Sequence, residues 1–432
     1  MRDASMEQTA LGISTTHSIA GDIRYSAREK EILRELAKQV AELAAHPRED
    51  EKKKLWFKLN DLQPVRPLVF CDPENGWNEI ITQDQILCEK PLFRVWEMGL
   101  RKEIYWATQM QDDRVIEPFF NVPYSYTDSG WGLSEVYTSG GDGGSHVWDS
   151  PIKDYAVDLD KLHFPEITVD YAKTNEIVEV AKEILGDILQ VRLRGLWWWT
   201  LGMTMDFIHL RGLENLMMDL MLYPDEVHRM MAFLRDSKLH MLDFLEKNNL
   251  LADNTGGTYV GSGGFGWTNQ LPQPVFNPAH VRTKDMWGFA ESQETVGISP
   301  EMFEEFIFPY QLPIMERFGL NCYGCCEPLD IRWHVVQKFP RLRRVSTSPW
   351  ANREKMAEFL GNNYVMSLKP SPTPLAMPTI DEAVIRAEIR KDLYTTRNCN
   401  VELIMKDNHT LGNNPMNAVR WCRIAKEEAG AL

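Results

Sequence analysis

Three of the chain's seven cysteines lie close together in the stretch FGLNCYGCCEPLDIRWH, residues 318–334, where Cys325 and Cys326 directly precede Glu327. Side chains alternate in direction along an extended segment, so Cys325 and Glu327 can face one way while Cys326 faces the other. Thiolate and carboxylate groups placed in this way are ligands that Zn²⁺ accepts. A metal site is therefore one of several functions that this stretch of cysteines could have.

Two other interpretations of these cysteines stay open. Cys322 and Cys325 form a C-x-x-C pair, although the helix start expected of a redox motif does not follow it. Thiols that pack at a strand end without a metal would give the same pattern. An odd number of cysteines spread unevenly over 432 residues argues against a disulfide framework.

A site built from such residues needs a scaffold that brings separate strand ends together. From about residue 65 onward, short apolar or β-branched runs alternate with helical patterns such as 224–249 and 299–319. This alternation predicts parallel strands in an α/β layer structure, and roughly eight units favour a (β/α)8 TIM barrel. The expected strands are 66–72, 188–195, 250–257, 294–299, 319–326, 341–348, 363–370 and 400–407.

The first part of the chain has a different pattern. Ser26 can cap a helix over 27–46, and Pro47 with the charged run that follows it ends that helix as a solvated segment. We therefore expect an N-terminal helical extension over 1–65 and a barrel over 66–432.

In a barrel of this kind the active site forms at the carboxyl ends of the strands. His409 follows the last expected strand, so it can join the cysteine stretch across the barrel mouth and leave one zinc position open, as a catalytic zinc requires. The polar residues expected at strand ends are Arg194, Asn254, Glu294, Cys325 with Glu327, Ser346 with Ser348, Lys369, and Asp407 with His409.

Tryptophans are unusually frequent, with 14 in the chain and three in a row at 197–199. They indicate either core packing or an aromatic wall for a flat apolar or methylated ligand. Two segments rich in Gly, Pro and aromatic residues, 121–151 and 259–278, fit the lids or walls of a site. The tryptophans proposed to bind substrate are Trp197, Trp199, Trp267 and Trp287.

Composition excludes some classes of partner. A net charge of −15 disfavours nucleic acid and anionic membrane surfaces. No apolar run approaches the roughly 20 residues that a membrane span needs, and the N-terminus lacks a signal-peptide pattern. We expect a cytoplasmic protein.

Three segments resemble the uroporphyrinogen decarboxylase superfamily. In 206–231 the sequence matches a "G-x-E-x-x-x-x-D-L…P-x-x-V" helix pair, and 298–319 matches a helix that begins "ISP-x-x-F-x-x-F-x-x-P". The segment 401–427 is similar to the closing strand, turn and helix of that superfamily. The resemblance covers roughly residues 65–430, and it implies the same barrel.

The resemblance favours one branch of the superfamily. Its decarboxylases hold an anionic substrate with a basic motif, whereas 64–80 contains only Arg66 as a basic residue. The methyltransferase branch binds zinc through "H-x-C-G" and "G-C" motifs. Tyr323 stands at the His position, Cys325 at the first Cys and His409 at the final Cys, so the implied zinc ligands are Cys325, His409 and Glu327.

The function that this implies is a zinc- and corrinoid-dependent methyltransferase. It would move a methyl group from a small methylated donor, methoxy-aromatic or methylamine-like, to the cobalt of a partner corrinoid protein. Alternatives are a methylcorrinoid:thiol methyltransferase, a decarboxylase-like lyase and a non-enzymatic binding protein. A homodimer is what the resemblance suggests. Catalytic roles are expected for Glu294, Lys369 and Tyr323.

Overall fold

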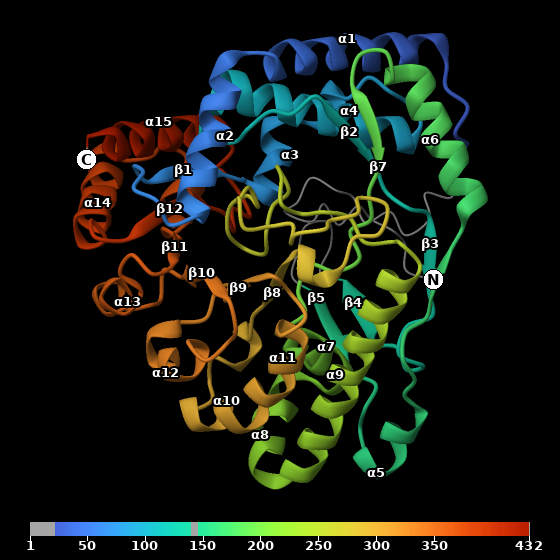
Figure 1. Ribbon diagram of the computed structural model, residues 1–432, viewed down its shortest axis with the longest axis vertical. Helices are drawn as coiled ribbons and strands as arrows, with labels where there is room; N and C mark the ends of the chain where they lie inside the picture. Colours follow the sequence, from blue (N-terminus) through green and yellow to red (C-terminus); the bar gives the residue numbers. More distant parts are fainter. Residues whose placement is uncertain (1–21, 140–145, 432) are drawn as a thin grey trace.

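The computed structural model describes residues 22–139 and 146–431, and a parallel sheet of six strands forms its centre (Figure 1). Neighbouring strands share a parallel register, such as Val365 opposite Asn400. The prediction of an α/β structure with parallel strands is confirmed. In spatial order the strands are β1 (Leu68–Cys71), β12 (Asn400–Met405), β11 (Val365–Leu368), β10 (Leu342–Thr347), β9 (Leu320–Tyr323) and β8 (Trp287–Ala290).

A second parallel pair consists of β2 (Phe119–Val122) and β7 (Gln190–Leu193). On one side of this pair, the backbone N–H of Asp113 donates to the Val69 carbonyl in β1 at 2.8 Å. On the other side, the segment after β7 bonds to β8 through the Leu201 N–H and the Phe289 carbonyl at 3.0 Å. The segments before β2 and after β7 thus form hydrogen bonds with the two edge strands of the main sheet.

The predicted loop 121–151 contains short antiparallel strands. β3 (Tyr126–Asp128) pairs with β6 (Ile167–Val169), and β4 (Val136–Ser139) pairs with β5 (His146–Asp149). Residues 140–145 of that loop lie outside the described residues.

Helices surround the strands, and α14 and α15 lie beside β1 and β12 (Figure 1). Expected helices 27–46, 224–249 and 299–319 correspond to α1, α9 and the pair α10–α11. The helices are α1 (Ala27–Ala44), α2 (Pro47–Asn60), α3 (Trp77–Ile80), α4 (Pro91–Tyr105), α5 (Tyr155–Asp158), α6 (Tyr171–Leu185), α7 (Thr204–Arg211), α8 (Leu213–Leu222), α9 (Pro224–Lys247), α10 (Pro300–Phe306), α11 (Phe308–Met315), α12 (Trp333–Val336), α13 (Arg353–Leu360), α14 (Glu382–Thr395) and α15 (Met416–Gly430).

The described part of the expected N-terminal extension packs closely onto the rest of the chain, while residues 1–21 lie outside the described residues. Ser26 and Glu29 form a reciprocal capping box at the start of α1, as the sequence predicts for Ser26. The charged run after Pro47 is helical, because Pro at the first position and acids in the first turn favour α2 there. In α2, Trp56 is buried and donates to the Asp113 carbonyl at 2.7 Å.

One expected strand is wrong. Residues 294–299 form a tight turn, and the strand of that unit is β8. Gly288 interrupts the pattern of side chains that would identify the strand in the sequence. A Cβ at this position would lie 2.6 Å from both Asn321 and Phe318. The close approach of β8 to its neighbours therefore needs the glycine.

A second expected strand, 250–257, forms no ladder in the structure. The Asn254 side-chain amide replaces ladder bonds, since it accepts from the Trp287 N–H and donates to the Trp287 carbonyl, both at 2.9 Å. A side chain thus ties this segment to β8.

A fully buried ion pair joins two strands of the main sheet. Arg344 of β10 and Glu402 of β12 approach to 3.1 Å on either side of β11. The Gly264 N–H donates to the same carboxylate at 2.9 Å, and Asn60 of α2 accepts from the guanidinium at 2.7 Å.

Among the helices of the described residues, none combines the length and apolarity needed to cross a membrane.

Candidate active site

The carboxyl ends of β9, β10 and β11 meet in a buried polar network. The Lys369 ammonium donates to the Ser346 hydroxyl at 2.7 Å, and that hydroxyl donates to the Cys325 carbonyl at 2.8 Å. Lys369 is 2% exposed, and burial lowers the pKa of its ammonium. Three of the residues expected at strand ends, Cys325, Ser346 and Lys369, are therefore brought together.

Glu327 fixes the turn that follows β9. One carboxylate oxygen accepts the Ser292 N–H and the other accepts the Cys325 N–H, both at 2.8 Å. Tyr323 stands nearby in the same strand, and its hydroxyl donates to the Gln311 side chain at 2.8 Å. The polar side-chain atoms of Glu327 and Tyr323 thus form hydrogen bonds with neighbouring elements of the fold.

The two adjacent thiols differ in character. Their sulfur atoms are 3.7 Å apart, with Cys325 buried and Cys326 partly exposed. The hydrogen bond between them lowers the pKa of Cys326, whereas that bond together with burial raises the pKa of Cys325. Cys326, not the buried Cys325, has the stronger thiolate character.

The proposed zinc ligands do not converge on one point. His409 is exposed, and its Nδ1 lies 3.4 Å from the side-chain amide of Asn75. Both oxygens of Glu327 already accept backbone N–H groups. Throughout 22–139 and 146–431, no three His, Cys, Asp or Glu side chains are grouped so that they could hold a metal ion. As placed, Cys325, Glu327 and His409 do not fit a zinc site.

Glu294 does not occupy a strand end, because β8 ends at Ala290, four residues before it. Its carboxylate accepts the Thr204 hydroxyl at 2.6 Å. Glu291 takes the strand-end position instead; it is fully buried, and its Oε1 has no hydrogen-bond partner in the structure. Burial, with the nearby Glu294, raises the pKa of Glu291 well above its usual range. Recognition of β8 in the sequence would have identified Glu291.

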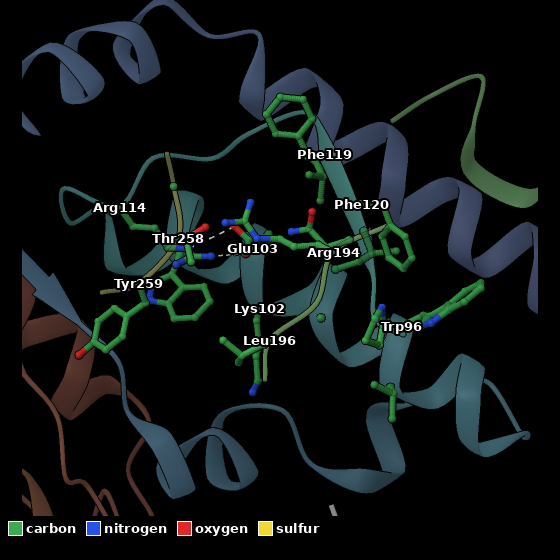
Figure 2. Close-up of a pocket in the computed structure, with 18 of the residues that line it drawn as sticks. Trp96, Lys102, Glu103, Arg114, Phe119, Phe120, Arg194, Leu196, Thr258 and Tyr259 are labelled. Atoms are coloured by element: carbon green, nitrogen blue, oxygen red, sulfur yellow. Dashed lines mark hydrogen bonds and ion pairs between the residues drawn. The ribbon is translucent and has the colours of Figure 1, made fainter. Parts of the chain in front are cut away.

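An aromatic cavity of about 190 Å³ lies elsewhere, between α4, β1, β2 and the end of β7. In the view of Figure 2, Arg114 and Glu103 lie at one end, Trp96 and Phe120 at the other, and Arg194 between them. Its aromatic lining consists of Phe70, Trp96, Trp106, Phe119, Phe120 and Tyr259.

The charged lining of this cavity is mainly cationic. Lys102, Arg114 and Arg194 face it together with one acid, Glu103. Arg114 pairs with Glu103, with Nε 3.2 Å from Oε2. Burial lowers the pKa of Lys102 to about 8, although the charge of the nearby Asp72 opposes that shift.

Gly99 opens the cavity on the α4 side. A Cβ at this position would meet no heavy atom within 4 Å, so no neighbour requires a glycine there. Glycine inside a helix costs roughly 1 kcal/mol relative to alanine. Gly99 lines the cavity, and the space that it leaves is part of the cavity's volume.

Arg194 is the one residue of the sequence-derived site that lines this cavity. Trp267 and Trp287 are buried, and the Trp287 indole donates to the Gly266 carbonyl at 2.9 Å. Trp197 donates to the Leu250 carbonyl at 2.9 Å, and Trp199 packs on Phe289. Sequence reasoning missed the cavity because much of its lining comes from α4, whose pattern is that of an ordinary amphipathic helix.

Comparisons with known proteins give limited information. No family model matches the sequence, and no curated protein matches it. Among solved structures, a methyltransferase from Methanosarcina mazei is similar in fold, with 11% sequence identity, a TM-score of 0.49, and coverage of 87% of this chain and 98% of that chain. At this identity and TM-score, the likeness identifies neither a family nor an activity.

Proposed function

We propose that this chain is a corrinoid-dependent methyltransferase that takes a methyl group from a methoxy-aromatic donor. One observation carries the proposal: a cavity lined by aromatic rings and by mainly cationic side chains lies beside β2 and the end of β7. The sequence resemblance to the methyltransferase branch supports it independently. The cationic lining disfavours a methylamine-like donor, because a methylated ammonium would be repelled.

We also infer that the strands close into a (β/α)8 barrel. The six-stranded sheet and the β2–β7 pair supply eight strands within the described residues, six parallel in one sheet and two parallel in the pair. The Asp113–Val69 and Leu201–Phe289 hydrogen bonds support closure, because they link the segments before β2 and after β7 to β1 and β8. Active sites of such barrels lie at the carboxyl ends of the strands, and the end of β7 contributes Arg194 and Leu196 to the cavity lining.

The donor's ring would lie against the aromatic lining, which excludes water and orients the methoxy group. A reduced corrinoid on a partner protein would supply the nucleophile that accepts the methyl group. When the methyl–oxygen bond breaks, its electron pair stays on the oxygen. The Lys102 ammonium would give that oxygen a proton and so release a neutral phenol. A pKa of about 8 suits a proton donor at neutral pH.

Zinc at Cys325, Glu327 and His409 stays a prediction from the resemblance alone. The separation of these side chains in the described residues does not support it. The step proposed above therefore uses only groups that line the cavity.

The direct test mixes the protein with reduced free cobalamin and 3,4-dimethoxybenzoate under anaerobic conditions. Chromatography should detect the demethylated phenol, and the rate should fall as pH rises through about 8, because Lys102 loses its proton there. Lys102→Met should slow phenol release on the order of 100-fold. The matched control is Lys38→Met, on the exposed face of α1. No phenol with several methyl ethers would refute the proposal.

A further inference from the structure

Arg194 occupies a fixed position in the lining of the cavity. Its backbone N–H donates to the Val122 carbonyl at 2.9 Å, which extends the β7–β2 ladder by one residue. The side chain is partly buried, lines the cavity and donates to the Asp253 carbonyl. A guanidinium has five N–H donors, so this single bond leaves most of them free for a ligand.

No carboxylate within the described residues approaches the Arg194 guanidinium within the 4 Å of an ion pair. Asp253 and Glu117 lie close enough to act on its charge, but Asp253 accepts the Thr255 N–H at 2.7 Å. Burial raises the pKa of Glu117, against the effect of Arg192. Burial, then Arg192, lowers the pKa of Arg194 to about 10, so it stays cationic at neutral pH.

A partly buried cation without an ion-pair partner, beside aromatic rings, is suited to an anion carried on an aromatic ring. The cavity also has room for an aromatic ring, since one of roughly 150 Å³ holds benzene and this one measures about 190 Å³. Arg192 does not offer the same site. It stacks on Phe119, with Cζ 3.5 Å from the ring centre, and bonds to Asn121 at 3.2 Å.

We propose that the methyl donor is a methoxylated aromatic carboxylate whose carboxylate binds Arg194, while its ring lies among Trp96, Phe119 and Phe120. The role of this ligand as methyl donor rests on the proposed function, whereas its binding to Arg194 does not depend on methyl transfer. A planar guanidinium matches a carboxylate with two parallel hydrogen bonds.

Calorimetry with three probes tests the proposal: 3,4-dimethoxybenzoate, the uncharged 3,4-dimethoxybenzamide, and trimethylphenylammonium. The benzoate should bind at least about tenfold tighter than the amide, and the ammonium should not bind. Arg194→Gln should weaken benzoate binding on the order of 30-fold and leave amide binding nearly unchanged. Arg194→Lys should retain part of the affinity, which guards against a Gln variant that fails to fold.

Arg192→Gln is the matched control, because it removes the same charge two residues earlier on β7, and it should change benzoate affinity less than about threefold. Equal binding of benzoate and amide, tighter binding of the ammonium, or no binding of any probe would overturn the proposal. Arg194-dependent binding without phenol release would refute the methyltransferase and leave the ligand class standing. Phenol release from the amide at the same rate as from the benzoate would refute the ligand class and leave the methyltransferase standing.

Discussion

The carboxyl ends of β9, β10 and β11 differ from the cavity beside β2 and β7 in how their charged groups are bonded. In the first region, called here the closed cluster (Cys325, Glu327, Ser346 and Lys369), polar groups bond to one another and to backbone groups. In the second, the aromatic cavity, the Arg194 guanidinium bonds to one carbonyl and faces open space. Saturated polar groups hold a fold in place, whereas partly unsatisfied ones are available to a ligand.

The largest effect is expected when the fully buried ion pair of Arg344 and Glu402 is broken. Arg344→Met would leave the Glu402 charge buried without its partner, and we expect the free energy of unfolding to fall by about 4 kcal/mol. Urea denaturation measures this loss in the free energy of unfolding. Arg343→Met changes the adjacent, partly exposed arginine and should cost about 1 kcal/mol or less. Equal losses in the two variants would contradict the difference in burial.

A smaller effect is expected within the closed cluster itself. Glu327→Ala would leave the N–H groups of Ser292 and Cys325 without acceptors, which should lower the free energy of unfolding by about 3 kcal/mol. Glu294→Ala removes one hydrogen bond, to Thr204, and should cost about 1 kcal/mol. If Glu327→Ala kept full stability, the structural role given to Glu327 would be wrong.

Sequence patterns predicted much of the fold, because apolar strands followed by amphipathic helices have distinct periods. β1, β7, β9, β10, β11 and β12 all lie within predicted segments. β8 was missed because Gly288 has no side chain to continue the pattern, and β2 because it lies beside a loop rich in Gly and Pro. The glycine serves packing between strands, which a single sequence does not reveal.

The site was harder to predict than the fold. Residue type drew attention to Cys325, Glu327 and Lys369, and the structure does bring these three together. Residue type gives no measure of unfilled space, however, and the cavity depends on Gly99 and on the face of α4 that carries Trp96. His409 lay near the right strand end in sequence but is directed to Asn75 at the surface.

The central claim is that the donor binds in the aromatic cavity and not at the closed cluster. Calorimetric titration of Gly99→Leu with 3,4-dimethoxybenzoate tests it most directly, because leucine at that position would fill the cavity without changing any charge. Leucine also favours the helix, so α4 should stay folded and the protein should be no less stable. We predict that benzoate binding falls at least about 30-fold relative to the unmodified chain. Unchanged affinity in a folded Gly99→Leu variant would contradict the account.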